Sequence, residues 1–220
     1  MRQGLAPVTA PDHGRDVITG ICALGRDMVA AGLVVASGGN ISAREPDGDT
    51  CWITAAGTWL DRLASGDCVE VRLADGQPVD PTRPAPSTEL ALHVATYQVR
   101  PDVHAVVHLH PQFAILLDVI GEPIRLITTD HLYYLRRIVR TPFHPPNSPE
   151  LAQVAAAAAA DGTDCVLLAH HGCSVLGPDL TMAGRRALNL EEAARLTYHA
   201  LLLGRETPGP PWDLPKAGLI

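Results

Sequence analysis

The sequence predicts a layered α/β fold. Segments with helical periodicity alternate with short apolar runs typical of buried strands, and this alternation places helices against a sheet. The chain has 220 residues, of which 46% are hydrophobic and 19% charged, a composition that suits a globular domain. The sequence contains no internal repeat, so we expect a single domain over residues 1–220, with loose, proline-containing tails at 1–13 and 205–220.

The first two predicted helices cover residues 16–33 and 86–99. In the first, one face carries the apolar residues Val17, Ile21, Leu24, Met28 and Ala31. Gly32 is the expected stop of this helix. In the second, Ser87 is the expected cap, and Glu89 lies in the first turn, where the helix dipole favours a carboxylate.

Two further helices are predicted in the second half of the chain. Residues 147–162 begin with Ser148 as cap and Pro149 at the first position, and Gly162 follows the end. A long amphipathic helix covers residues 180–204. Its expected inner stripe consists of Ala183, Ala187, Leu190, Ala194, Thr197 and Leu201.

Short strands are predicted at residues 51–57, 68–76, 102–109 and 165–172. Side chains alternate between the faces of a strand, so residues two apart project together, about 6.5 Å apart along the chain. In the third strand one face carries Val103, Ala105, Val107 and Leu109, and the other carries His104, Val106, His108 and His110. His108 and His110 can therefore point at one place.

Four histidines and a glutamate suggest a metal site. His108 and His110 end one apolar strand, His170 and His171 end another, and Glu89 opens the helix before the first of these strands. Three imidazoles and an oxygen ligand form the donor set of a catalytic zinc site, which keeps one position for substrate or water. The alternative is a half-solvated sheet rim with polar residues at the strand ends.

Several common catalytic motifs are missing. No glutamate follows the H-x-H pair at the spacing of a cupin. There is no G-x-S-x-G, no P-loop and no G-x-G-x-x-G, which disfavours a serine hydrolase and a nucleotide-binding fold.

Three loops rich in small residues suit an anion such as phosphate. They are "ASGGNISAR" at 36–44, "TAAG" at 54–57 and "PST" at 86–88. Their backbone amides and hydroxyl groups can donate hydrogen bonds to one group. Each of them is also compatible with an ordinary turn or cap.

Charge and cysteine content restrict the partners and the compartment. A net charge of −7 without a basic cluster argues against nucleic acid, although it permits a small anionic substrate. The five cysteines form no C-x-x-C pair, which favours reduced thiols in the cytoplasm. The N-terminus lacks a signal-peptide core, and no apolar run is long enough to span a membrane.

Four separated blocks, in this order, resemble the class II aldolase/adducin family: "SGGNIS", "ITAAG", "PSTELALHVATYQVRPDVHAVVHLHP" and "LLAHHG". The resemblance extends from about residue 16 to about residue 203. It implies a three-layer α/β/α sandwich around a largely antiparallel sheet. It also implies a homotetramer whose active sites lie between subunits.

The resemblance further implies a set of site residues. The ligands of one zinc ion per subunit fall on His108, His110 and His171, and His170 becomes a supporting residue. Glu89 matches the catalytic acid/base, which also ligates zinc before substrate arrives. The phosphate-binding positions fall on Gly39, Asn40, Ala56, Gly57, Ser87 and Thr88.

The implied reaction is the reversible cleavage of a ketose 1-phosphate to dihydroxyacetone phosphate and an aldehyde. It would pass through a zinc-bound enediolate, with Glu89 moving the proton next to the carbonyl group. A tyrosine from the neighbouring subunit supplies the second acid in the family. Here Tyr134 is the predicted residue, with Tyr133, Asp130 and His131 as alternatives.

The sequence departs from the family's aldolases at three places. Ala56 replaces a threonine of the phosphate loop, Trp212 is the one large aromatic residue of the C-terminal tail, and residues 122–146 match no member well. A nonphosphorylated acid is therefore an alternative substrate.

Three alternative functions follow from the same family. A zinc-dependent decarboxylase is the leading one, with Arg136 or Arg137 to bind a carboxylate. A sugar-phosphate epimerase is disfavoured because the epimerases carry an aspartate at the position of Glu89. A non-catalytic, adducin-like assembly module would not need the zinc ligands.

Overall fold

The computed structural model describes residues 13–45 and 48–209. Most of both predicted tails, with Trp212, therefore lies outside the described residues. The strands are β1 (Asn40–Arg44), β2 (Thr50–Thr54), β3 (Cys68–Arg72), β4 (Ala105–Leu109), β5 (Ile138–Arg140), β6 (Cys165–Leu168) and β7 (Gly172–Gly177). The helices are α1 (His13–Ala30), α2 (Leu90–Val99), α3 (Gln112–Ile120), α4 (Thr129–Leu135), α5 (Pro149–Ala159) and α6 (Leu180–Leu202), with short 3₁₀ helices at Leu60–Arg62 and Ser65–Asp67.

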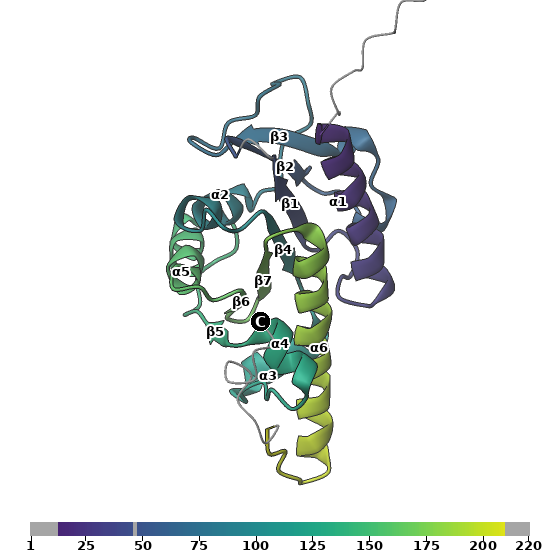
Figure 1. Cartoon of the computed structure of the whole chain (residues 1–220), viewed down its shortest axis with the longest axis vertical. Coiled ribbons are helices and arrows are strands. Elements are labelled where there is room, and N and C mark those ends of the chain that lie inside the picture. Colours follow the sequence, from purple (N-terminus) through teal and green to yellow (C-terminus); the bar gives the residue numbers. More distant parts are fainter. Residues whose placement is uncertain (1–12, 46–47, 210–220) are drawn as a thin grey trace, which may run out of the picture.

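The seven strands form one sheet in the order β3-β2-β1-β4-β7-β6-β5. Every neighbouring pair is antiparallel except β5 and β6, which run parallel. The prediction of a largely antiparallel sheet is confirmed. β4 lies in the middle of the sheet, between β1 and β7, and this central position gives the H-x-H strand neighbours on both sides (Figure 1).

Helices cover both faces of the sheet, which confirms the three layers. α1 and α6 pack on one face together with α3 and α4, and α2 and α5 pack together on the other (Figure 1). Because its side chains alternate as predicted, β4 contributes to both cores. Ala105, Val107 and Leu109 pack in the α1/α6 core, and Val106 packs in the α2/α5 core. Because both faces are buried, the interpretation of this strand as a half-solvated rim is wrong.

The predicted helix signals hold at most ends. Gly32 follows α1 with a φ of +78°, although Ala31 lies beyond the last helical residue. The Ser148 side chain accepts from the Leu151 N–H group at the start of α5, as expected of a cap. In α6 the predicted stripe faces the core, with Leu201 partly buried and its other members fully buried.

Helix α2 begins later than predicted. Its first residue is Leu90, and Glu89 occupies the N-cap position. The reason is that the preceding segment is held extended: the Ala56 N–H group donates to Ala85 and the Ser87 N–H group to Thr54. Ser87 still binds the chain locally, since its hydroxyl oxygen accepts from the Glu89 N–H group at 3.2 Å.

Two other expectations about the elements need correction. The strand predicted at 165–172 ends at Leu168, where the chain turns and continues from Gly172 as β7. Three strands (β1, β5 and β7), two α-helices (α3 and α4) and the two 3₁₀ helices were not predicted at all. Among the described residues, no helix is both long enough and apolar enough to cross a membrane.

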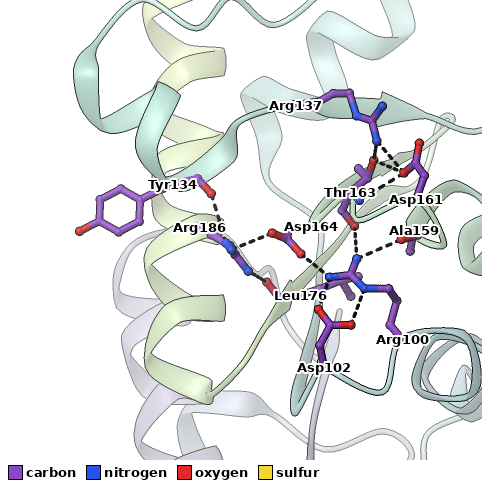
Figure 2. A network of polar contacts seen from close by, with 10 residues as sticks. All are labelled: Arg100, Asp102, Tyr134, Arg137, Ala159, Asp161, Thr163, Asp164, Leu176 and Arg186. Carbon is purple, nitrogen blue, oxygen red and sulfur yellow. Dashed lines mark hydrogen bonds and ion pairs between the residues drawn. The ribbon is translucent and has the colours of Figure 1, made fainter. Parts of the chain in front are cut away.

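A buried ion-pair network ties α2 and α6 to the loop before β6 (Figure 2). The Asp164 carboxylate lies 3.0 Å from Arg100 Nη2 and 2.7 Å from Arg186 Nη2, and the side chains of all three residues are less than a tenth exposed. Arg186 also donates to the main-chain oxygens of Leu176 and Tyr134. One buried carboxylate therefore bridges two buried guanidinium groups, and Asp102 also pairs with Arg100.

Replacing this carboxylate should destabilise the fold strongly. Asp164→Ala should lower the free energy of unfolding by about 3 kcal/mol, because it removes the buried carboxylate that two buried guanidinium groups share. Asp102→Ala is the matched control: Asp102 pairs with the same Arg100, but its side chain is 65% exposed. Urea titration should show that the control loses less than about 1 kcal/mol of its free energy of unfolding. Equal losses in the two variants would contradict this assignment.

Candidate metal centre and anion pocket

Three histidines meet at the end of β4. His108 is the penultimate residue of the strand and His110 follows it, while His171 comes from the turn between β6 and β7. β4 pairs with β7 so that Leu109 lies opposite Cys173, which brings that turn beside the two strand-end histidines. The three ligand nitrogens lie within 4.8 Å of one another, and the ring centroids are 4.8–5.0 Å apart. The fourth histidine, His170, points elsewhere, toward Phe143.

The orientation of His108 is fixed by a backbone hydrogen bond. Its Nδ1 atom donates to the Cys173 carbonyl oxygen at 3.0 Å. This bond leaves Nε2 of the ring facing the other histidines, 3.0 Å from His110 Nε2. This is the arrangement in which an imidazole can serve as a metal ligand.

Glu89 brings a buried carboxylate to the same place. Its Oε2 atom is 2.9 Å from His108 Nε2 and its Oε1 atom is 3.5 Å from His171 Nε2. Within the described part of the chain, Oε1 of Glu89 and Nδ1 of His171 have no hydrogen-bond partner. Unprotonated imidazole nitrogens and a carboxylate repel one another unless a positive charge lies between them. The donor set of three imidazoles and one carboxylate fits a zinc ion.

The protonation states suit cation binding. Burial, followed by the charges of His108 and His171, lowers the pKa of His110 to about 4. Burial and the charge of His108 also lower the pKa of His171. Both rings are thus neutral near pH 7 and have lone pairs available. Burial raises the pKa of Glu89, but the hydrogen bond and charge of His108, with the Asn40 amide, outweigh it and bring this pKa to about 2.

A buried chain of hydrogen bonds holds Glu89 from behind. The Asn40 side-chain amide donates to Glu89 Oε2 at 3.1 Å, and its carbonyl oxygen accepts from His93 Nε2. His93 Nδ1 in turn meets Ser42 Oγ at 2.7 Å, and Ser42 Oγ meets the Tyr97 hydroxyl at 2.8 Å. Burial lowers the pKa of His93 to about 3, so its ring is neutral and can donate from one nitrogen and accept at the other.

The sequence analysis missed His93, Ser42 and Tyr97. A signal was available, because Glu89, His93 and Tyr97 are spaced at i, i+4 and i+8, the spacing of residues on one face of a helix. Asn40, predicted as a phosphate ligand, uses its side chain on Glu89 and His93 in this structure. A contact between Asn40 and phosphate stays a prediction.

Glu89, His110 and His171 line a cavity of about 370 Å³. Its lining residues are Ser37, Gly38, Gly39, Asn40, Ala55, Ala56, Gly57, Thr58, Ser87, Thr88, Glu89, His110, Pro146, Asn147 and His171. All six residues predicted to bind phosphate are among them. The lining residues include no lysine or arginine. An anion bound here would therefore contact neutral N–H and O–H groups. Of the lining residues, Thr58, Pro146 and Asn147 lie outside the predicted loops and the predicted ligand set.

Glycine is required where the first anion loop crosses the end of β4. Gly39 has a φ of +76°, and a Cβ atom there would lie 2.6 Å from the His108 carbonyl oxygen. A Cβ atom on Gly38 would lie 2.9 Å from His110 Nδ1. The loop can thus approach the metal ligands closely because it has no side chains at these two positions.

The predicted second acids do not reach this cavity within one chain. Tyr133, Tyr134, Asp130 and His131 lie on α4, which packs on α6, and none of them lines the cavity. His131 is buried and accepts from the N–H groups of Ile127 and Thr128. The Tyr134 ring points away from the ion-pair network (Figure 2) and packs edge-on against Tyr133. A catalytic role for Tyr134 therefore requires the site of a neighbouring subunit.

The two arginines considered for a carboxylate substrate lie elsewhere. Arg137 pairs with Asp161 at 2.6 Å and donates to Thr163 (Figure 2). Arg136 has a φ of +53° at the end of α4 and does not line the cavity. Neither residue supplies a cation to the cavity of its own chain.

A family model and curated relatives match most of the chain. The model described as Class II Aldolase and Adducin N-terminal domain matches residues 19–198. The chain is 34% identical over 170 residues to an L-fuculose phosphate aldolase of Methanocaldococcus jannaschii, covering 77% of this chain and 89% of that protein. It is 32% identical over 180 residues to a 3-oxo-tetronate 4-phosphate decarboxylase of Haemophilus influenzae, covering 80% and 83%.

A solved structure agrees with these matches. The L-fuculose-1-phosphate aldolase of Thermus thermophilus superposes with a TM-score of 0.74 at 28% identity, over 90% of this chain and all of that one. The matching segments contain the histidine triad, Glu89 and the three small-residue loops described above. The resemblance predicted from the motifs is confirmed, and the chain belongs to the class II aldolase and adducin family.

Proposed function

We propose that the protein is a zinc-dependent aldehyde-lyase of the cytoplasm that cleaves a ketose 1-phosphate similar to L-fuculose 1-phosphate. The products would be dihydroxyacetone phosphate and an aldehyde. One observation carries the proposal: three imidazoles and an ionised carboxylate converge at one place, and Glu89, His110 and His171 line a cavity there together with the small-residue loops. The relatives named L-fuculose phosphate aldolase support it.

His108, His110 and His171 would hold the metal ion, with Glu89 as a fourth ligand until substrate arrives. Zinc bound there would supply a Lewis acid that stabilises negative charge developing on the substrate oxygens. The chain's own contribution is to fix the orientation of one ring and to keep the other two neutral. His108 is fixed by Cys173, while His110 and His171 are kept neutral by burial.

The phosphate group would lie against the small-residue loops. Ser87 Oγ already accepts from the Glu89 N–H group, so its own O–H group is available to donate. The proposed set is completed by the backbone amides of Gly39 and Gly57 and by the Thr88 hydroxyl. These groups lie close to the N-terminus of α2, and the dipole at a helix N-terminus favours an anion. Ala56 contributes no hydroxyl group here.

Glu89 would move the proton on the carbon next to the carbonyl group. Its carboxylate is ionised, lines the cavity and keeps one oxygen free of hydrogen bonds, while Asn40 holds the other. In the synthetic direction Glu89 would take the proton from dihydroxyacetone phosphate, and in cleavage it would return it. Tyr134 of a neighbouring subunit is the proposed second acid at the aldehyde oxygen.

A decarboxylase of a related phosphorylated acid is the second candidate. The specific observation in its favour is that the Haemophilus influenzae decarboxylase is nearly as similar as the aldolases. The same triad and Glu89 would serve it. Against it, no arginine or lysine of the described residues lines the cavity. The complete donor set also disfavours a non-catalytic assembly module.

Removing one imidazole should abolish metal binding. His110→Ala should weaken zinc binding by more than about 100-fold, since loss of a direct ligand costs more than loss of a supporting contact. Zinc content after dialysis against a chelator measures this. His104→Ala is the control, because His104 lies directly before the same strand but does not belong to the triad. Full zinc occupancy in the His110 variant would contradict the ligand assignment.

Glu89→Gln should separate proton transfer from metal binding. The variant should keep much of its zinc, while deuterium entry into dihydroxyacetone phosphate in heavy water should slow by about 10²-fold or more, because the general base is lost. Proton NMR follows the exchange, and Glu122→Gln, outside the cavity, is the control. Normal exchange in Glu89→Gln would assign the base elsewhere. No exchange by zinc-loaded wild type would favour the decarboxylase.

The assembly should be a homotetramer. Among the described residues, none of the predicted second acids lines the cavity, so we expect partner subunits to complete it. Light scattering should give about four times the chain mass of 23.4 kDa. A monomer with full activity would contradict the role proposed for Tyr134.

A further inference from the structure

Helix α3 connects two of the metal-ligating segments. It begins two residues after His110, and its N-cap residue, Pro111, provides no side-chain cap. Glu191 of α6 takes over this function: its carboxylate accepts from the N–H groups of Phe113 at 2.9 Å and Ala114 at 3.0 Å. The start of α3 is therefore held in place next to His110.

Asp118, near the end of the same helix, reaches the turn that carries His171. Its Oδ2 atom accepts from the His170 N–H group at 2.7 Å, and its Oδ1 atom accepts from Arg140 Nε of β5. The Asp118 side chain is only 3% exposed, so this hydrogen bond is shielded from water. A charged acceptor paired with a guanidinium group makes a stronger hydrogen bond than a neutral one.

The turn needs an outside partner because its backbone is strained. The His171 N–H group donates to the Leu168 carbonyl oxygen at 3.0 Å, which closes a four-residue turn between β6 and β7. His170, the third residue of this turn, has a φ of +56°. Glycine normally occupies such a position, since a side chain is unfavourable there. The Asp118 carboxylate binds the N–H group of the strained residue itself.

We propose that Asp118 is a positioning residue for the metal ligand His171. It acts through the His170 backbone, and with Glu191 it makes α3 a brace that sets the position of His171 relative to His110. The inference rests on the metal site of the proposed function. It assigns a role to a buried carboxylate and to a cation, Arg140, that the proposed chemistry does not otherwise use.

The test measures metal affinity rather than activity. Metal-free full-length protein is titrated with Zn²⁺ in competition with a chromophoric chelator. Asp118→Ala should bind zinc about 10- to 100-fold more weakly, the range for loss of a supporting contact to a metal ligand. Asp118→Asn keeps an oxygen acceptor and should lose about threefold or less.

A control variant removes an exposed Asp–Arg ion pair away from the turn. Asp161 pairs with Arg137, which lies just before β5. Among the interactions of the described residues, Asp161 makes no hydrogen bond to the turn at residues 168–172. Asp161→Ala should bind zinc like wild type. The Co²⁺-loaded proteins give a second readout, because the visible spectrum of the ion reports its coordination and should change in Asp118→Ala alone.

A rescue experiment separates positioning from general stability. Adding His170→Gly to Asp118→Ala removes the side-chain strain of the turn and should recover part of the lost zinc affinity. If Asp118→Ala does not fold, Arg140→Gln replaces it: this arginine side chain is 49% exposed, and the variant should still weaken zinc binding by about threefold.

The outcomes distinguish the two proposals. Zinc affinity in Asp118→Ala equal to that of wild type, or no recovery with His170→Gly, would overturn the positioning role and leave the metal site standing. Wild-type protein that binds no zinc would overturn the proposed function itself. Weakened binding in Asp118→Ala with wild-type binding in Asp161→Ala would support the inference.

Discussion

The site depends on three imidazoles and a carboxylate that converge at one place. Among the described residues, no lysine or arginine lines the cavity beside them. Glu89 and His108 approach to 2.9 Å in a nearly water-free place, beside two further imidazoles. Burial raises the pKa of Glu89, but the contact with His108 outweighs it and brings this pKa to about 2. A divalent ion at the same position would satisfy all four groups at once.

The sheet supplies this arrangement through three adjacent strands. β4 brings His108 and leads to His110, β7 brings the turn with His171, and β1 brings Asn40 opposite His108. Each strand thus delivers one part of the site to the same end of the sheet. The loop before β1 can cross this end only because Gly38 and Gly39 lack side chains. Substrate would therefore meet metal ligands and phosphate donors in one cavity of about 370 Å³.

Local patterns predicted the parts of the site that lie within one segment. The H-x-H alternation of β4, the caps of α5 and the stripe of α6 follow from residues that are neighbours in sequence, and the structure confirms them. The late start of α2 was not predictable in this way. It results from pairing of residues 85–87 with residues 54–56, about thirty positions earlier.

Tertiary contacts account for the rest. β7 was missed because its segment begins and ends with glycine and becomes a strand through pairing with β4 and β6. Asp118 lies in an apolar helix, and its partner His170 is 52 residues away. His93 is an exception: its spacing from Glu89 was visible, but a histidine on a helix gives no sign of its partner Asn40 until β1 is placed.

X-ray absorption at the zinc edge of the metal-loaded protein tests the central claim most directly. The account predicts three imidazole nitrogens at about 2.0 Å together with oxygen ligands, without sulfur. The five cysteines are free and buried, so a sulfur shell would require a different site. Fewer than three imidazoles, or any thiolate ligand, would contradict the assignment of His108, His110 and His171 as the metal centre.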